Sequence, residues 1–144
     1  MNNLGYLLQL SAKLMKYQLN KELEQKDFTP AQWAIIKHLQ ILEEHDAPID
    51  QFMAVSMAHE LDMDKPTISG VIKRLTDKGF IEKLPHPTDK RAFILCLTSK
   101  TKEMIPSLEE LSDKTIKKAT TGFTPNELEE LTRYLIRVSQ NLKE

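Results

Sequence analysis

The chain has 144 residues, of which 40% are hydrophobic and 28% are charged, and its formal net charge is −1. This is the size of one ordinary domain with a packed core, so we predict a single domain over residues 1–144. The sequence contains no run of about 18 apolar residues and no apolar leader, and its one cysteine cannot form an internal disulfide. We therefore expect a cytoplasmic protein that does not cross a membrane.

Charge is unevenly distributed along the chain. Residues 64–91 contain seven lysine and arginine residues against four aspartate and glutamate residues, a net charge of +3, while the remainder carries −4. A basic segment in an otherwise mildly acidic chain is typical of a surface that contacts phosphates.

The first two elements are predicted to be helices. Helical spacing predicts the first helix from about Asn3 to Gln25, with apolar residues at Leu4, Leu7, Leu8, Leu14, Met15, Leu19 and Leu23. The second begins after Thr29 as N-cap, with Pro30 at the first helical position and Gln32 completing a capping box. It should run to about Glu44 and bury Trp33, Ile36, Leu39 and Leu42.

A loop and a third helix are predicted next. The segment from Glu43 to Gln51 has no apolar periodicity and contains turn-forming residues, so it is predicted to be a loop. The third helix should cover Gln51 to Leu61, as the first half of a helix-turn-helix. Its buried residues are predicted to be Phe52, Val55, Ala58 and Leu61.

The following segment predicts a short helix and a β-hairpin. Asp64 can cap a helix that tolerates Pro66 in its first turn, and Gly79 can close it in a left-handed conformation. Its apolar residues, Ile68, Val71, Ile72 and Leu75, share one face. Two runs rich in β-forming residues, 80–84 and 92–97, flank a polar tip and predict a hairpin. Together these elements have the outline of a winged helix.

Two further helices complete the prediction. Thr98 can start a helix that reaches about Thr120, in which Pro106 should bend the helix or delay its regular start. Thr124 and Glu127 form a second capping box, for a last helix from Pro125 to about Asn141. This helix is predicted to bury Leu128, Leu131, Leu135 and Val138.

These residues resemble the DNA-binding lobe of the MarR (multiple antibiotic resistance regulator) family. The matching positions, in order, are Met57-Ala58, Leu61, Met63 to Ser69, Arg74-Leu75, Lys78 to Lys83, Asp89 to Arg91 and Leu97-Thr98. The chain departs from the family pattern at Asp62, Gly70, Lys83 and Lys90.

The resemblance implies a mainly α, α+β fold with a winged helix-turn-helix at about residues 29–98. The terminal helices, at about 1–25 and 99–144, would form a homodimer, and their amphipathic pattern independently favours self-pairing. The implied function is that of a sequence-specific double-stranded DNA-binding transcriptional regulator, a ligand-responsive repressor acting on a palindromic operator.

The predicted DNA-binding residues lie on the fourth helix and the hairpin. Small and polar residues on the exposed helix face can approach a major groove, cations can bind phosphates, and the hairpin tip can enter a minor groove. The set comprises Lys65, Pro66, Thr67, Ser69, Gly70, Lys73, Arg74, Lys83, Asp89, Lys90 and Arg91. Arg74 is equally consistent with a structural role.

The resemblance also implies a pocket for a small aromatic or phenolic effector between the terminal helices and the winged lobe. Its candidate lining residues are Tyr6, Met15, Trp33 and His38, although a plain core role is also consistent with each of them.

Other functions are less consistent with the sequence. It has no nucleophile elbow and no glycine-rich phosphate loop, so we expect neither an enzyme nor a cofactor. The four histidines have no metal-ligand spacing, and the acidic cluster at 43–46 is better explained as an exposed helix end, so no metal is predicted. The resemblance allows a redox-sensing role for Cys96, but the position of this residue favours a spectator thiol. The competing hypothesis is a winged-helix protein-interaction module that does not bind DNA.

Overall fold

The computed structural model describes residues 3–143. The elements in chain order are α1 (Leu4–Glu24), α2 (Pro30–Glu44), the 3₁₀ helix η1 (Ile49–Phe52), α3 (Ala54–Glu60), α4 (Lys65–Asp77), β1 (Ile81–Pro85), β2 (Phe93–Leu97), α5 (Ser99–Ala119) and α6 (Pro125–Leu142). Residues 1, 2 and 144, which the prediction included in its terminal segments, lie outside the described part. This mainly helical architecture with a two-stranded antiparallel sheet confirms the predicted fold class.

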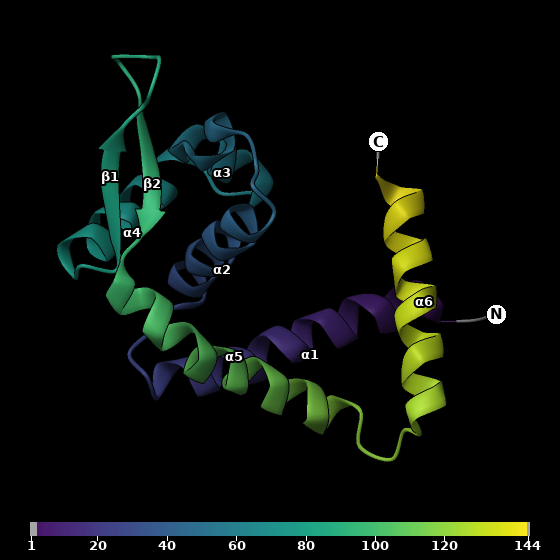
Figure 1. Ribbon diagram of the computed structural model, residues 1–144. Coiled ribbons are helices and arrows are strands. Elements are labelled where there is room, and N and C mark those ends of the chain that lie inside the picture. The colour runs from purple at the N-terminus through teal and green to yellow at the C-terminus, as the bar shows by residue number, and fades with distance from the viewer. Residues whose placement is uncertain (1–2, 144) are drawn as a thin grey trace.

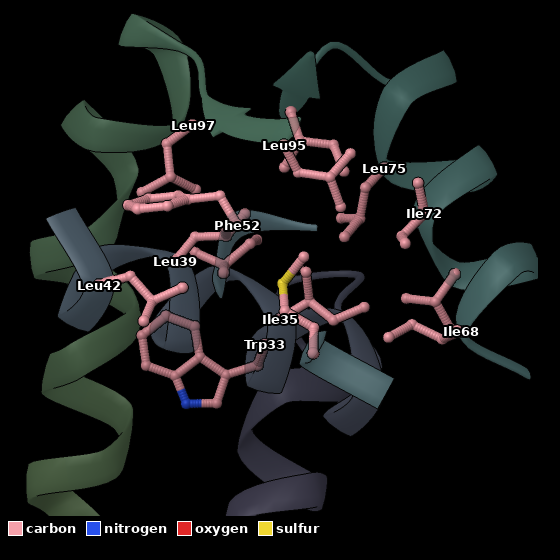
Figure 2. Packing of buried hydrophobic residues seen from close by; sticks show 14 of the residues in the cluster. Trp33, Ile35, Leu39, Leu42, Phe52, Ile68, Ile72, Leu75, Leu95 and Leu97 are labelled. Atoms are coloured by element: carbon pink, nitrogen blue, oxygen red, sulfur yellow. The ribbon is translucent and has the colours of Figure 1, made fainter. Parts of the chain in front are cut away.

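The central lobe is built around one hydrophobic core. Side chains from α2, η1, α4 and β2 point toward a common centre in Figure 2, which shows Ile35, Leu39, Phe52, Leu75 and Leu95 among them. The predicted stripe of α2 is buried, and so is the predicted apolar face of α4. Ile35, which the prediction left out, is fully buried as well.

Helices α2 and α6 begin at the capping residues that the sequence predicted. Thr29 and Gln32 form both hydrogen bonds of the capping box at the start of α2, and Thr124 and Glu127 do the same for α6. Each pair satisfies two backbone N–H groups that a helix start leaves without partners. At the other end of α4, Gly79 has a φ of 77°, the left-handed conformation predicted for it.

The third helix differs from its prediction. A 3₁₀ turn, η1, occupies residues 49–52, and α3 begins only at Ala54 after the extended residue Met53. Because of this break, α3 turns a different side to the core than the single predicted helix over Gln51 to Leu61 would. The prediction that Val55 is buried is therefore wrong. Its side chain is 59% exposed, and Met57 fills the core instead.

The hairpin and the start of α5 form one connected unit. β1 and β2 pair from Ile81 with Leu97 to Pro85 with Phe93. Thr98 caps α5, and its hydroxyl also donates to the carbonyl of Gly79 at 2.8 Å. The buried hydroxyl of Thr101 donates to the carbonyl of Phe80 at 2.6 Å. Helix α5 runs regularly from Ser99 across Pro106, so its start is not delayed as one alternative had predicted.

The terminal helices extend away from the winged lobe, as Figure 1 shows. Helix α1 lies along α5, where Lys114 reaches Glu22 and Lys118 reaches Gln18. Helix α6 (yellow) stands apart from the winged lobe, and none of its described side chains is buried within this chain. The predicted burial of Leu131, Leu135 and Val138 is therefore wrong for a single chain. Within residues 3–143, no helix is both long and apolar enough to span a bilayer.

Candidate nucleic-acid interface

Helix α4 presents a polar face because its apolar residues are used by the core. The Oδ1 atom of Asp64 accepts the Thr67 N–H at 2.8 Å, and this hydrogen bond lowers the pKa of the Asp64 carboxyl. The Asp64 carboxylate is therefore negatively charged at neutral pH, and it interacts favourably with the positive end of the α4 helix dipole. With the four apolar residues turned inward, Thr67, Ser69 and Lys73 are exposed on the opposite face.

Several predicted DNA-binding residues meet in one hollow on this face. The hollow has a volume of about 550 Å³ and is lined by Pro66, Ser69, Gly70, Lys73, Thr76, Asp77 and Lys83. Lys83 comes from β1, so the helix and the hairpin share this surface. Lys73 pairs with Asp77 at 3.0 Å, but its side chain remains 78% exposed. An exposed ion pair of this kind is weak, and a phosphate can compete for the lysine.

Gly70 and Arg74 are neighbours on the same helix. A Cβ atom added at Gly70 would lie 3.4 Å from Nη2 of Arg74, so the guanidinium folds back toward the glycine. The glycine keeps the centre of the exposed face flat, and Arg74 borders that flat area.

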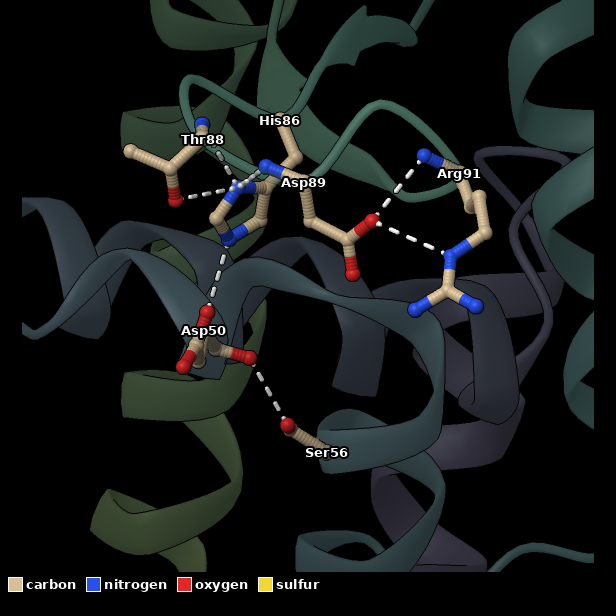
Figure 3. A network of polar contacts seen from close by, with 6 residues as sticks. All are labelled: Asp50, Ser56, His86, Thr88, Asp89 and Arg91. Atoms are coloured by element: carbon tan, nitrogen blue, oxygen red, sulfur yellow. Dashed lines mark hydrogen bonds and ion pairs between the residues drawn. The ribbon is translucent and has the colours of Figure 1, made fainter.

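The hairpin tip presents the remaining predicted residues. In Figure 3 the carboxylate of Asp89 faces both the backbone and the side chain of Arg91. Its Oδ1 atom accepts the Arg91 N–H at 3.0 Å and lies 3.6 Å from Nε of the guanidinium. Asp89 and Arg91 are therefore in contact at the hairpin tip. The Arg91 side chain is 93% exposed, and Lys90 beside it is exposed too.

His86 is part of this tip, and sequence reasoning missed its role. Its side chain is only 5% exposed, and its Nε2 atom lies 2.7 Å from Oδ1 of Asp50 in η1. Its Nδ1 atom accepts the N–H groups of Thr88 and Asp89, both at 3.1 Å. The two partners His86 and Asp50 are 36 residues apart, so no local spacing could have indicated the contact.

A second cavity lies between α3, α4 and the hairpin. It has a volume of about 400 Å³, and Lys65, Ser69 and Lys83 line it together with the apolar residues Met53, Ala54, Val55, Ala58, Ile68, Ile72, Phe93 and Leu95. The exposed positions of Val55 and Phe93 are explained in part by this cavity, because both side chains form its wall.

The four predicted effector-binding residues lie at different depths. Trp33 belongs to the core, Tyr6 is exposed on α1, and Met15 and His38 are half-buried. His38 lines a hollow of about 600 Å³ whose other walls come from residues 51–60. None of the four lines the cavity beside α4.

The remaining candidate groups offer little reactive chemistry. Burial, followed by the carboxylates of Glu43 and Glu82, raises the pKa of the Cys96 thiol, while Lys102 opposes the shift. The thiol therefore stays protonated near neutral pH, which favours the spectator role predicted for it. Among residues 3–143, no group of three or more His, Cys, Asp or Glu side chains is placed to hold a metal ion.

Comparison with known proteins gives a consistent result. Residues 28–93 match the MarR family model. A crystal structure described as MarR is 25% identical to this chain, with a TM-score of 0.76 and 97% of each chain covered. A mutant MarR from E. coli complexed with operator DNA is 24% identical, with a TM-score of 0.72, 94% of this chain and 92% of that chain covered. The S. aureus MepR–DNA complex is 20% identical, with a TM-score of 0.74, 99% of this chain and 100% of that chain covered.

Proposed function

We propose that the protein is a double-stranded DNA-binding transcriptional regulator, because residues 28–93 match the MarR family model and confirm the predicted resemblance. The observation that carries the proposal is the shared polar surface of α4 and β1, in which Ser69, Gly70, Lys73 and Lys83 line one hollow. The basic charge of residues 64–91 lies on the same lobe. Solved complexes of similar fold with DNA support the proposal.

In this proposal the exposed face of α4 enters the major groove. The short side chains of Thr67 and Ser69 reach base edges, and the absence of a side chain at Gly70 allows a close approach. Lys65, Lys73 and Lys83 bind phosphates, which determine affinity and register more than sequence preference. Arg91 at the hairpin tip enters the adjacent minor groove, where an arginine responds to groove width.

The regulator acts as a homodimer on a palindromic operator. The support is the apolar surface left uncovered on the terminal helices, including Leu7 and Leu14 of α1 and Leu135 and Leu142 of α6. A two-fold axis through paired terminal helices would place two copies of α4 in successive major grooves. The operator is therefore an imperfect palindrome with half-site centres about 10 base pairs apart.

We also propose that a small aromatic or phenolic molecule controls DNA binding. The cavity between α3, α4 and the hairpin supports this, because apolar walls meet two lysines there. An aromatic carboxylate in this cavity would use Lys65 and Lys83, which the DNA proposal assigns to phosphates, so ligand and DNA would compete. The pocket predicted from Tyr6, Met15, Trp33 and His38 stays a prediction.

The test of DNA binding compares two lysine variants on operator DNA from upstream of the protein's own gene. Lys73→Ala removes a proposed phosphate contact, so we expect affinity to fall about threefold to tenfold and the slope of log K against log salt to decrease by about one. Lys26→Ala removes the same charge from the exposed turn after α1 and should change neither quantity.

The outcomes of this test separate the two candidate functions. Equal losses from both variants would mean that α4 is not the recognition helix. No duplex binding at low salt would contradict the proposal and favour the protein-interaction module. A steep loss of affinity with rising salt supports the regulator.

A further inference from the structure

The tip of the hairpin is attached to the helix-turn-helix through a buried histidine. His86 follows the last residue of β1, and its backbone N–H continues the strand ladder by donating to the carbonyl of Ala92 at 3.0 Å. Its ring turns inward and meets Asp50 of η1, as Figure 3 shows. Asp50 is itself connected to α3, because its backbone carbonyl accepts the hydroxyl of Ser56 at 2.7 Å.

The hydrogen bonds of the ring determine which nitrogen carries the proton. Backbone N–H groups can only donate, and those of Thr88 and Asp89 both point at Nδ1. Nδ1 must therefore be unprotonated, which leaves the proton of a neutral imidazole on Nε2. That Nε2–H donates to the carboxylate of Asp50 at 2.7 Å, a short charge-assisted hydrogen bond.

The same contacts continue to the arginine at the tip. The N–H of Asp89 donates to His86, and the side chain of Asp89 holds the backbone and the guanidinium of Arg91. The carbonyl of Asp89 accepts the N–H of Ala92 at 3.1 Å, which closes the turn. A continuous series of contacts thus runs from Asp50 through His86 and Asp89 to Arg91.

From this geometry we propose that His86 is a positioning residue for DNA recognition. By tying the tip to η1 it sets where Arg91 lies relative to α4, so that the helix and the tip can engage adjacent grooves together. Without this contact, the tip would be held only by the ends of the two strands that carry it, and Arg91 would lose its defined position. The inference rests on the proposed DNA-binding function.

The test uses two substitutions of Asp50, whose side chain is 77% exposed and contributes little to the core. Asp50→Asn and Asp50→Ala remove the same negative charge, but only the asparagine keeps an oxygen that can accept the Nε2–H of His86. We expect Asp50→Asn to retain most of the parent's operator affinity and Asp50→Ala to bind about fivefold more weakly. If only the charge of Asp50 mattered, Asp50→Ala would bind operator DNA more tightly than the parent, because the loss of a carboxylate reduces repulsion from DNA.

The same two Asp50 substitutions in the Arg91→Ala protein show whether Asp50 influences DNA affinity by way of Arg91. In the Arg91→Ala protein, the two Asp50 variants should bind operator DNA equally. Equal affinities in the parent background, or the same difference in the Arg91→Ala background, would overturn the proposal. A purely structural role of Asp50 predicts a difference that persists without Arg91.

Amide hydrogen exchange without DNA tests the tie itself. The N–H groups of Thr88 and Asp89 should exchange slowly in the parent and in Asp50→Asn, and fast in Asp50→Ala. His86→Asn should keep them protected, because its side-chain oxygen can replace Nδ1, but should bind DNA as weakly as Asp50→Ala. Equal exchange in the parent, Asp50→Asn and Asp50→Ala proteins overturns the inference. If the parent binds no duplex but shows the expected exchange pattern, the proposed function fails and the tie is supported.

Discussion

Arg91 is so exposed that its substitution should affect DNA binding without affecting folding. Its guanidinium is almost fully exposed and lies 3.6 Å from Asp89, so the pair contributes well under ~1 kcal/mol to stability. We predict that Arg91→Ala leaves the melting temperature nearly unchanged but lowers operator affinity at least tenfold, about 1.4 kcal/mol. Asp89→Ala should cause a smaller loss. Parent-like affinity of Arg91→Ala at physiological salt would show that the tip does not contact DNA.

Substitution of Gly70 by alanine is predicted to increase stability and to decrease DNA affinity. A glycine inside a helix costs about 0.5–1 kcal/mol relative to alanine, and a Cβ here would meet only the flexible end of Arg74. Gly70→Ala should therefore raise the free energy of unfolding by up to that amount. Because its methyl group would stand on the face that approaches DNA, we expect operator affinity to fall about threefold, ~0.7 kcal/mol.

The matched control for this prediction is Gly5→Ala on α1. Among the described residues, no atom other than those of its chain neighbours and of the α1 backbone itself lies within 4 Å of a Cβ built at Gly5. Urea unfolding should show a gain for both variants, while a DNA titration should show a loss for Gly70→Ala alone. Unchanged affinity of Gly70→Ala would mean that the helix backbone does not approach the DNA closely.

The junction between the winged lobe and α5 depends on two threonines, Thr98 and Thr101. Thr101 is fully buried, and its hydroxyl donates to the Phe80 carbonyl just beyond the end of α4. Thr101→Val keeps the shape but removes this donor, so we predict a loss of about 1–1.5 kcal/mol in the free energy of unfolding. The control is Thr132→Val on α6, where an exposed hydroxyl donates to Leu128. Equal unfolding midpoints for the two variants would contradict a structural role for this junction.

In the described residues, the apolar face of helix α6 is exposed to solvent, which favours pairing with a second copy of the chain. Its apolar residues form one stripe, yet Leu131 and Leu135 are exposed in the single chain. We predict that Leu131→Lys combined with Leu135→Lys converts a dimer into a monomer of 16.6 kDa, measured by light scattering. Glu129→Lys on another face of α6 should remain dimeric. A dimer that survives the double substitution would place the interface elsewhere.

Most helix boundaries of this chain could be predicted from residues that are close together in the sequence. Thr29, Asp64, Thr98 and Thr124 each cap the helix predicted to follow them, and Gly79 closes α4. These features could be predicted because a cap involves residues within about four positions of one another, and a periodic apolar face needs only some core to bury it.

Features that depend on distant partners could not be predicted from the sequence. The 3₁₀ turn η1 changed which side of α3 faces the core, so Met57 replaced Val55 there. The contact between His86 and Asp50 spans 36 residues, and within residues 3–143 the apolar stripe of α6 contains no buried side chain. In each case, burial and hydrogen bonding depend on which surfaces meet in space, and local residue patterns do not specify this.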